Sequence, residues 1–139
     1  CGKNITHLGP SGAGQVTKLA NQLIVAQTID AVAQALRLAE LSGVDPALVR
    51  KALLGGFAES RVLEVHGERM LRHEFPAGAK VTTQLKDMRN ILQQAQNLAL
   101  HLPVSAEVLA LYQNLASYAP DLDHAAVLLE LERLQEHKQ

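Results

Sequence analysis

The sequence has few aromatic residues and almost no net charge, and each shortage argues against a class of partner. Aromatic residues make up 3% of the 139 residues and tryptophan is absent, which removes the stacking surfaces that single-strand nucleic-acid binders use. A formal net charge of −1 provides no long-range attraction to nucleic acid or to an anionic membrane. We therefore expect no nucleic-acid partner.

Cysteine is confined to Cys1, so one chain can build neither an internal disulfide nor a thiolate metal cluster. No apolar run approaches membrane-spanning length and no signal-peptide pattern opens the chain. These absences predict a cytoplasmic protein with no membrane association. Among the six histidines, His66 and His73 could share a helix face, but no spacing of histidine and carboxylate converges into a ligand set, so we predict no metal site.

What the sequence does contain is helical periodicity, almost from end to end. Hydrophobic residues at 47% and charged residues at 19% are typical of a folded domain, and glycine and proline fall between the periodic segments. We predict one all-α domain over residues 1–139, with a short extended lead-in over 1–11 and a turn at Gly9–Gly14. The six predicted helices run from Gln15 to Ser42, from Pro46 to the glycines at 55–56, from a Ser60 cap to near Glu74, from Thr82 or Thr83 to about Leu100, from Ser105 to Tyr118, and from a cap at Asp121 or Asp123 to about Leu134.

The first predicted helix is about 40 Å long and carries apolar residues on more than one face. Other helices should therefore enclose it, which predicts a helical bundle around a long central helix. Five shorter helices are a thin cover for such a rod, so we also expect a homodimer or higher homo-oligomer. The apolar residues expected at that interface are Val25, Ile29, Val32 or Leu36, together with Leu111, Val127 and Leu131.

Lys18 lies in the first turn of this predicted helix and heads the apolar stripe that continues through Val25 and Ile29. Both desolvation and the positive end of the helix dipole favour a neutral amine, which a lysine needs to exchange protons near neutral pH. Asn21 and Gln22 follow three and four residues later on the same side, so the three polar groups form a candidate site. The same geometry also fits a lysine whose ammonium reaches solvent past the helix end.

Two glycine-rich segments and one further lysine are weaker signals. Gly9–Gly14 could receive an anion at a helix N-terminus, or could simply allow a tight turn and close packing. The segment 55–60, Gly-Gly-Phe-Ala-Glu-Ser, is consistent with a C-cap followed by an N-cap. Lys86 shares a polar stripe with Asn90 and Asn97, and such a stripe is typical of a solvated helix face.

Taken together, the segments 9–22, 55–60 and 85–88 resemble the C-terminal half of the β-hydroxyacid dehydrogenase family in order and spacing. The resemblance implies the all-helical fold of the 6-phosphogluconate dehydrogenase C-terminal domain. It also implies that an N-terminal Rossmann domain, absent from this chain, binds most of the NAD or NADP. We therefore expect the isolated chain to be inactive.

The resemblance also implies roles for individual residues. Lys18 matches the catalytic lysine, Asn21 and Gln22 match substrate-binding positions, and Lys86 matches a lysine on the cofactor side of the cleft. Many members carry a second Asn where this sequence has Gln22, and the Phe that commonly precedes the Lys-Asp pair is missing from 76–83. The implied reaction interconverts a small β-hydroxy acid and its semialdehyde, with reduction of tartronate semialdehyde to glycerate as the specific candidate. The alternative is a non-catalytic helical oligomerisation module.

Overall fold

The computed structural model describes the backbone of residues 2–138 and the side-chain surroundings of residues 12–136. Within these ranges the chain forms six α-helices and one 3-10 helix, with no β-strand, so the all-α prediction is confirmed. The elements are α1 (Gly2–Leu41), α2 (Pro46–Leu53), α3 (Arg61–Arg72), α4 (Val81–Asn97), α5 (Pro103–Ala116), η1 (His124–Ala126) and α6 (Val127–Lys138).

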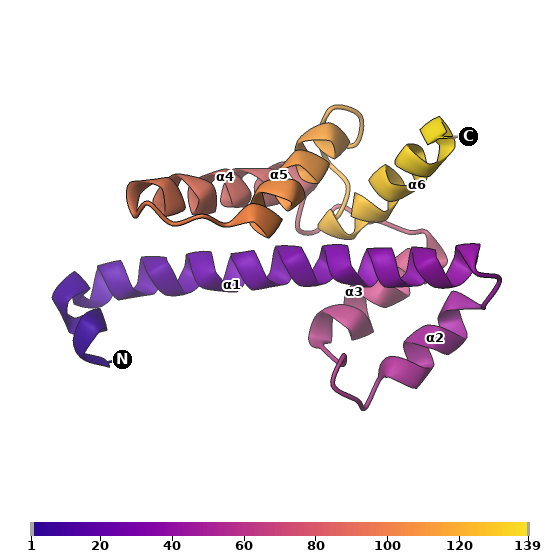
Figure 1. The fold of residues 1–139 in the computed structure, drawn as a ribbon, viewed down its shortest axis with the longest axis horizontal. Helices are drawn as coiled ribbons and strands as arrows, with labels where there is room; N and C mark the ends of the chain where they lie inside the picture. The colour runs from indigo at the N-terminus through magenta and orange to yellow at the C-terminus, as the bar shows by residue number, and fades with distance from the viewer. Residues whose placement is uncertain (1, 139) are drawn as a thin grey trace.

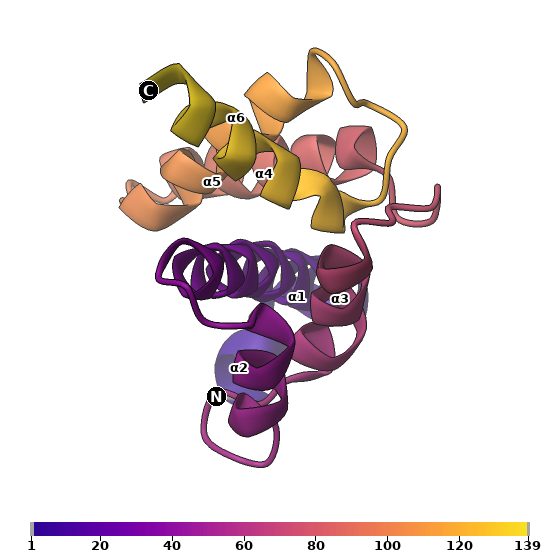
Figure 2. The ribbon, with the colours of Figure 1, turned by 90° about the vertical axis from the view of Figure 1, so that its right-hand side faces the viewer.

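Helix α1 is the central element, and the other helices lie on two of its sides. α4, α5 and α6 lie on one side, while α2 and α3 lie on the other (Figures 1 and 2). The cover is uneven along the helix: α4 and α5 run beside its first half, whereas α6, α2 and α3 all lie beside its second half (Figure 1). The predicted bundle around a long central helix is confirmed, with its second half enclosed from both sides.

The predicted start of the first helix is wrong. Over residues 2–14 the predicted extended lead-in and the turn at Gly9–Gly14 are replaced by helix, and Cys1 lies outside the described residues. A helix satisfies backbone N–H and C=O groups within the segment itself. Figure 1 shows the first turns of α1 bent away from its main axis, as expected where a Gly-Pro pair interrupts the hydrogen-bond ladder.

Three predicted caps are confirmed. The Asp45 side chain accepts a hydrogen bond from the N–H of Ala47 at 2.9 Å, with Pro46 at the first helical position. The Ser60 hydroxyl accepts from Leu63 N at 2.9 Å, and Asp123 accepts from Ala125 N at 2.9 Å at the start of η1. Such caps satisfy backbone donors that have no partner inside the helix.

The predicted starts of α4 and α5 are corrected by one or two residues. α4 begins at Val81 without a threonine cap, because the N–H groups of Val81 and Thr82 donate to the carbonyls of Leu122 and Pro120. These partners lie 41 and 38 residues away in the sequence, so no local pattern could indicate them. α5 begins at Pro103, whose missing N–H is harmless at the first helical position.

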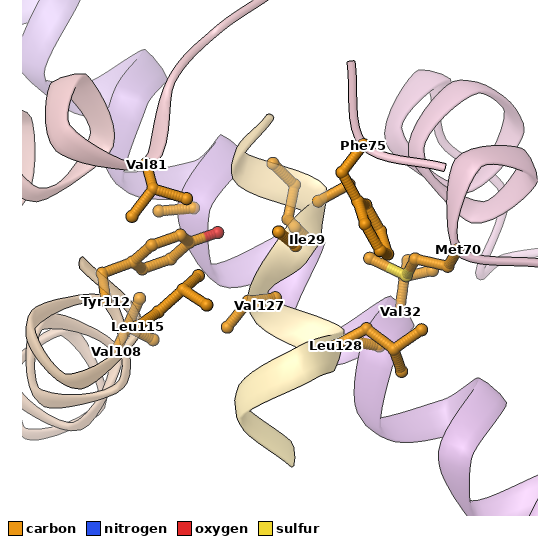
Figure 3. Packing of buried hydrophobic residues seen from close by; sticks show 14 of the residues in the cluster. Ile29, Val32, Met70, Phe75, Val81, Val108, Tyr112, Leu115, Val127 and Leu128 are labelled. Atoms are coloured by element: carbon orange, nitrogen blue, oxygen red, sulfur yellow. The ribbon is translucent and has the colours of Figure 1, made fainter. Parts of the chain in front are cut away.

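The core lies where the second half of α1 meets the helices on both sides. Figure 3 shows Tyr112, Val81 and Leu115 at one end of this core and Ile29 near its middle, and Tyr112 Oη donates to the backbone carbonyl of His124 at 2.8 Å. Toward the other end, Val32 lies among three residues from α3, α6 and the segment after α3, namely Met70, Leu128 and Phe75.

This packing overturns much of the predicted subunit interface. Ile29 and Val127 are fully buried, and Val32 and Leu36 are 8% and 4% exposed, within the core of the chain itself. Because α3, α4 and α6 already cover them, they are not available to a second subunit. The large apolar residues of α1 that remain exposed are Val16, Ile24, Leu38 and Leu41.

Candidate active site

The three polar residues predicted on the first helix do share one face of α1. Asn21 and Gln22 follow Lys18 by three and four residues, which places them about one turn further along on the same side. Lys18 and Asn21 are exposed, and Gln22 is half-buried against α4. Gly14 lies one turn before Lys18 on this face. Together Gly14, Lys18, Asn21 and Gln22 form what we call the polar face of α1.

The Gln22 amide is held in one orientation by two hydrogen bonds. Its Nε2 donates to Asp87 Oδ2 on α4 at 2.7 Å, and its Oε1 accepts from Asn21 Nδ2 at 3.0 Å. A half-buried hydrogen bond to a carboxylate is among the stronger ones in proteins. One N–H of Gln22 and the Oδ1 of Asn21 are left to contact a ligand.

Lys86 is brought to the same part of the molecule, but not into contact with Lys18. It precedes Asp87 on α4, so the Gln22–Asp87 bond places it next to the polar face. Its side chain is exposed. Within the described part of the chain, neither Lys18 nor Lys86 takes part in a salt bridge. Two ammonium groups are therefore available on adjoining helices.

The local environment predicted for Lys18 is wrong on two points. Lys18 lies well inside α1 instead of in its first turn, so the positive end of the helix dipole does not act on it. It is also exposed, because α2 and α3 lie beside the second half of the helix only. The stripe that continues from Lys18 does become buried further along, from half-buried Val25 to fully buried Ile29. Lys18 therefore stands at the open end of that stripe.

The two glycine-rich segments differ in what their glycines do. Gly14 is helical, and a Cβ built on it meets no other atom within 4 Å, so neither a turn nor close packing within the described chain accounts for a glycine there. The segment 55–60 fits the structural interpretation. Gly55 has φ +92°, which favours glycine, and the Ser60 hydroxyl caps α3.

Asp87 is the residue of this site whose role sequence reasoning missed. It lies 65 residues from Gln22 in the sequence, and no periodicity links positions on two different helices. Its place beside Lys86 in the Lys-Asp pair was the only available signal.

The prediction that no histidines and carboxylates converge is also wrong. The structure brings His66, Asp123 and His124 together, with one possible ligand atom from each lying within 4.8 Å of the others. His66 is on α3 and the other two residues are at η1, 57 and 58 residues later. Spacing within one helix could not have indicated this cluster.

Comparison with solved structures establishes the class of fold. The chain superposes on the crystal structure of 3-hydroxyisobutyrate dehydrogenase from Salmonella typhimurium with a TM-score of 0.80 at 22% identity, covering 84% of this chain and 41% of that one. The fold is therefore that of a helical domain found in dehydrogenases of this type.

Sequence comparison then establishes the family. Residues 12–131 match the family described as NAD-binding of NADP-dependent 3-hydroxyisobutyrate dehydrogenase, and the chain belongs to it. The 2-hydroxy-3-oxopropionate reductase of Escherichia coli is 49% identical over 138 residues, which are 99% of this chain and 47% of that protein. A probable mitochondrial 3-hydroxyisobutyrate dehydrogenase-like protein of Arabidopsis thaliana is 35% identical over 94% of this chain and 39% of its own length.

These relatives confirm the resemblance inferred from the sequence, and NAD or NADP is the cofactor of the family. The chain spans less than half the length of the curated relatives that it matches. Among the described residues, no helix is long and apolar enough to cross a membrane.

Proposed function

We propose that this chain is the substrate-binding half of an NAD(P)-dependent oxidoreductase that interconverts a small β-hydroxy acid and its semialdehyde. The observation that carries the proposal is the polar face of α1. A free ammonium at Lys18 stands beside an amide held in place at Gln22, with open space over Gly14 one turn away. A dinucleotide-binding domain, outside this chain, is the partner that we propose closes over this face.

The residues present fit a dinucleotide bound across the polar face. Lys86 offers an exposed cation beside it, and the open space over Gly14 lets a ligand approach the helix backbone closely. Bound NAD(P)H supplies the hydride. Within this chain, Lys18 then donates a proton to the carbonyl oxygen of the substrate, and removes it again in the oxidative direction.

Asn21 and Gln22 orient the substrate in this proposal. The hydrogen bond from Gln22 to Asp87 fixes the amide before the substrate arrives, so little side-chain entropy is lost on binding. The longer side chain of Gln22, and the 49% identity to the Escherichia coli reductase, support tartronate semialdehyde as the substrate that is reduced to glycerate. A cytoplasmic location remains a prediction.

An oligomerisation role is compatible with this activity and is supported by a separate observation. An apolar groove of about 190 Å³ lies between the first half of α1 and the end of α4, lined by residues that include Val16, Leu23 and Leu98. We propose that a second copy covers it in a homo-oligomer. Sedimentation equilibrium of the protein should give a mass above one chain, and Leu98→Asp should lower that mass. A purely non-catalytic module leaves the polar face unexplained.

The catalytic proposal is tested by Lys18→Met in the protein that carries this chain together with its dinucleotide-binding domain. Losing a positioned general acid should lower kcat by about a hundredfold or more, with little change in cofactor affinity. Lys51→Met, at an exposed position on α2, is the matched control and should retain normal kcat. Near-normal turnover of Lys18→Met on semialdehyde substrates would remove the proposed role.

A further inference from the structure

The cluster of His66, Asp123 and His124 lies where α3 meets the start of η1. His66 Nε2 and His124 Nε2 are 2.8 Å apart. Asp123 is fully buried and His124 is 8% exposed. The cluster joins α3 to the start of η1, which are far apart in the sequence.

The hydrogen bond on the far side of His124 fixes which of its nitrogens is free. His124 Nδ1 lies 2.9 Å from Gln84 Oε1, and because an amide oxygen only accepts, Nδ1 carries the proton. The lone pair of His124 Nε2 therefore faces His66. A ring whose other nitrogen donates to a fixed oxygen is the usual arrangement of a metal-ligating histidine.

The metal-free cluster leaves buried polar atoms without partners. To donate to His124, His66 must carry its proton on Nε2, so its buried Nδ1 faces the backbone carbonyl of Val62 with a lone pair and not with an N–H. Nε2 of Gln84, a residue only 2% exposed, is a second buried atom without a partner. A buried acceptor such as His66 Nδ1 in a native protein commonly contacts an ordered water or an ion, whereas the N–H groups of the Gln84 amide can only donate to an acceptor.

We propose that His66, Asp123 and His124 form a binding site for a divalent transition-metal ion of the Zn²⁺ type, with a further coordination position left open. Two imidazole nitrogens and one carboxylate oxygen form a donor set that suits this ion. Tetrahedral coordination requires the ligand atoms to lie about 3.3 Å apart, so the two Nε2 atoms separate slightly from 2.8 Å and the Asp123 oxygen, within 4.8 Å of both, moves closer. Binding the ion at Nε2 moves the His66 proton to Nδ1 and releases no net proton.

The charge around the cluster sets how tightly the ion binds. Asp123 Oδ1 accepts a hydrogen bond from Arg69 Nη1 at 3.0 Å, so this guanidinium competes with a cation for the carboxylate. The Arg69 side chain is 35% exposed and can turn toward solvent when the ion arrives.

The test is calorimetric titration of Zn²⁺ into chelator-treated protein that carries Cys1→Ser to remove the only thiol of this chain. We expect one Zn²⁺ per chain and a raised Tm, since a ligand that binds only the folded state stabilises it. His66→Gln should weaken binding at least about tenfold. His101→Gln, at an exposed histidine outside the cluster, should leave binding unchanged, and Arg69→Gln should tighten it. Excess Mg²⁺ should not displace the ion.

Absence of binding up to about 1 mM Zn²⁺, or equal affinity in wild type and His66→Gln, would overturn the proposal. If His66→Gln fails to fold, Co²⁺ titration of the wild type and of Arg69→Gln replaces it. The proposal is supported if Co²⁺ produces the visible absorption bands of a four-coordinate site, and if these bands saturate at a lower Co²⁺ concentration in Arg69→Gln than in wild type. Their absence in both proteins refutes it.

Discussion

Two isoleucines near the middle of α1 have opposite surroundings. Ile24 is 62% exposed, whereas Ile29, five residues later, is fully buried. Five residues turn about 140° around a helix, so Ile29 faces the core with Tyr112 and Val81 (Figure 3), while Ile24 lies on a face that is also exposed at Leu38. The part of α1 up to Ile24, which we call its open half, has α4 and α5 beside it but not α2 and α3 (Figure 1), and it carries Lys18, Asn21 and Gln22; the enclosed half follows. Stability and candidate chemistry are thus separated along one helix.

The largest expected effect is on stability in the enclosed half. Ile29→Ala removes buried methyl groups and leaves a cavity, and should lower the free energy of unfolding by about 2–5 kcal/mol. Ile24→Ala is the matched control at an exposed position, with an expected change within about 0.5 kcal/mol. Denaturant unfolding of both variants gives the comparison. Equal losses would mean that the first half is as enclosed as the second.

Gly14→Ala should separate stability from function in the open half. Alanine has open space there and favours a helix interior by about 0.5–1 kcal/mol over glycine, so stability should rise while kcat/KM for the semialdehyde falls. Gly67→Ala is the control, because Gly67 is also helical but is packed against another helix. A Cβ at Gly67 would lie 3.3 Å from Arg50 Cδ, whereas a Cβ at Gly14 meets nothing. A Gly14→Ala protein that is both more stable and fully active would place the substrate elsewhere.

Gln22→Asn tests whether the open half of α1 binds the substrate through the Gln22 amide. The shorter side chain withdraws its amide from the substrate and from Asp87, so KM should rise a few-fold for a hydroxylated substrate and less for a methylated one. Steady-state kinetics with both substrates measure the ratio. An equal rise in the two KM values would show that the Gln22 amide does not contact the substrate hydroxyl.

A smaller expected effect is the pH dependence that the buried Asp30, in the enclosed half of α1, gives to the free energy of unfolding. Burial raises the pKa of Asp30 above 3.8, with the Gln34 hydrogen bond opposing, so the folded state favours the protonated carboxyl. Its stabilising contribution is present below pH 3.8 and is lost as pH rises through the folded pKa.

Asp30→Asn removes this dependence. Its free energy of unfolding should therefore improve relative to wild type as pH rises from about 4 to 7. Glu107→Gln, at an exposed position on α5, is the control and should show no such trend. A constant difference between Asp30→Asn and wild type would mean that Asp30 titrates normally.

Local features of the fold could be predicted from sequence because their causes are local. The caps at Asp45, Ser60 and Asp123 each join a side chain to a backbone N–H two or three residues away. The start of α4 could not be predicted, because carbonyls from the segment before η1 satisfy its first N–H groups. Incomplete cover of α1 could be predicted from its length, but not where along the helix the cover is missing, since periodicity reports apolar faces and not which helices lie beside them.

The candidate site also contains features that the sequence could predict and features that it could not. Lys18, Asn21 and Gln22 share a face by helical spacing alone, and resemblance supplied their implied roles. The bond from Gln22 to Asp87 and the meeting of His66 with His124 depend on contacts between helices. Such contacts follow from the packing of whole elements and leave no local pattern.

The most direct test of Lys18 as the proton donor is its chemical protection by substrate. The protein that carries this chain is treated with a limiting amine-reactive reagent, with and without NADP⁺ and a small β-hydroxy acid, and the modification of each lysine is followed by mass spectrometry. Lys18 and Lys51 are both exposed on helices, so they should react at similar rates in the free protein. Ligands should slow modification of Lys18 about tenfold or more, the extent expected when the occupied fraction exceeds nine-tenths, and leave Lys51 unchanged. Equal labelling of Lys18 with and without saturating ligands would contradict a substrate bound at the polar face of α1.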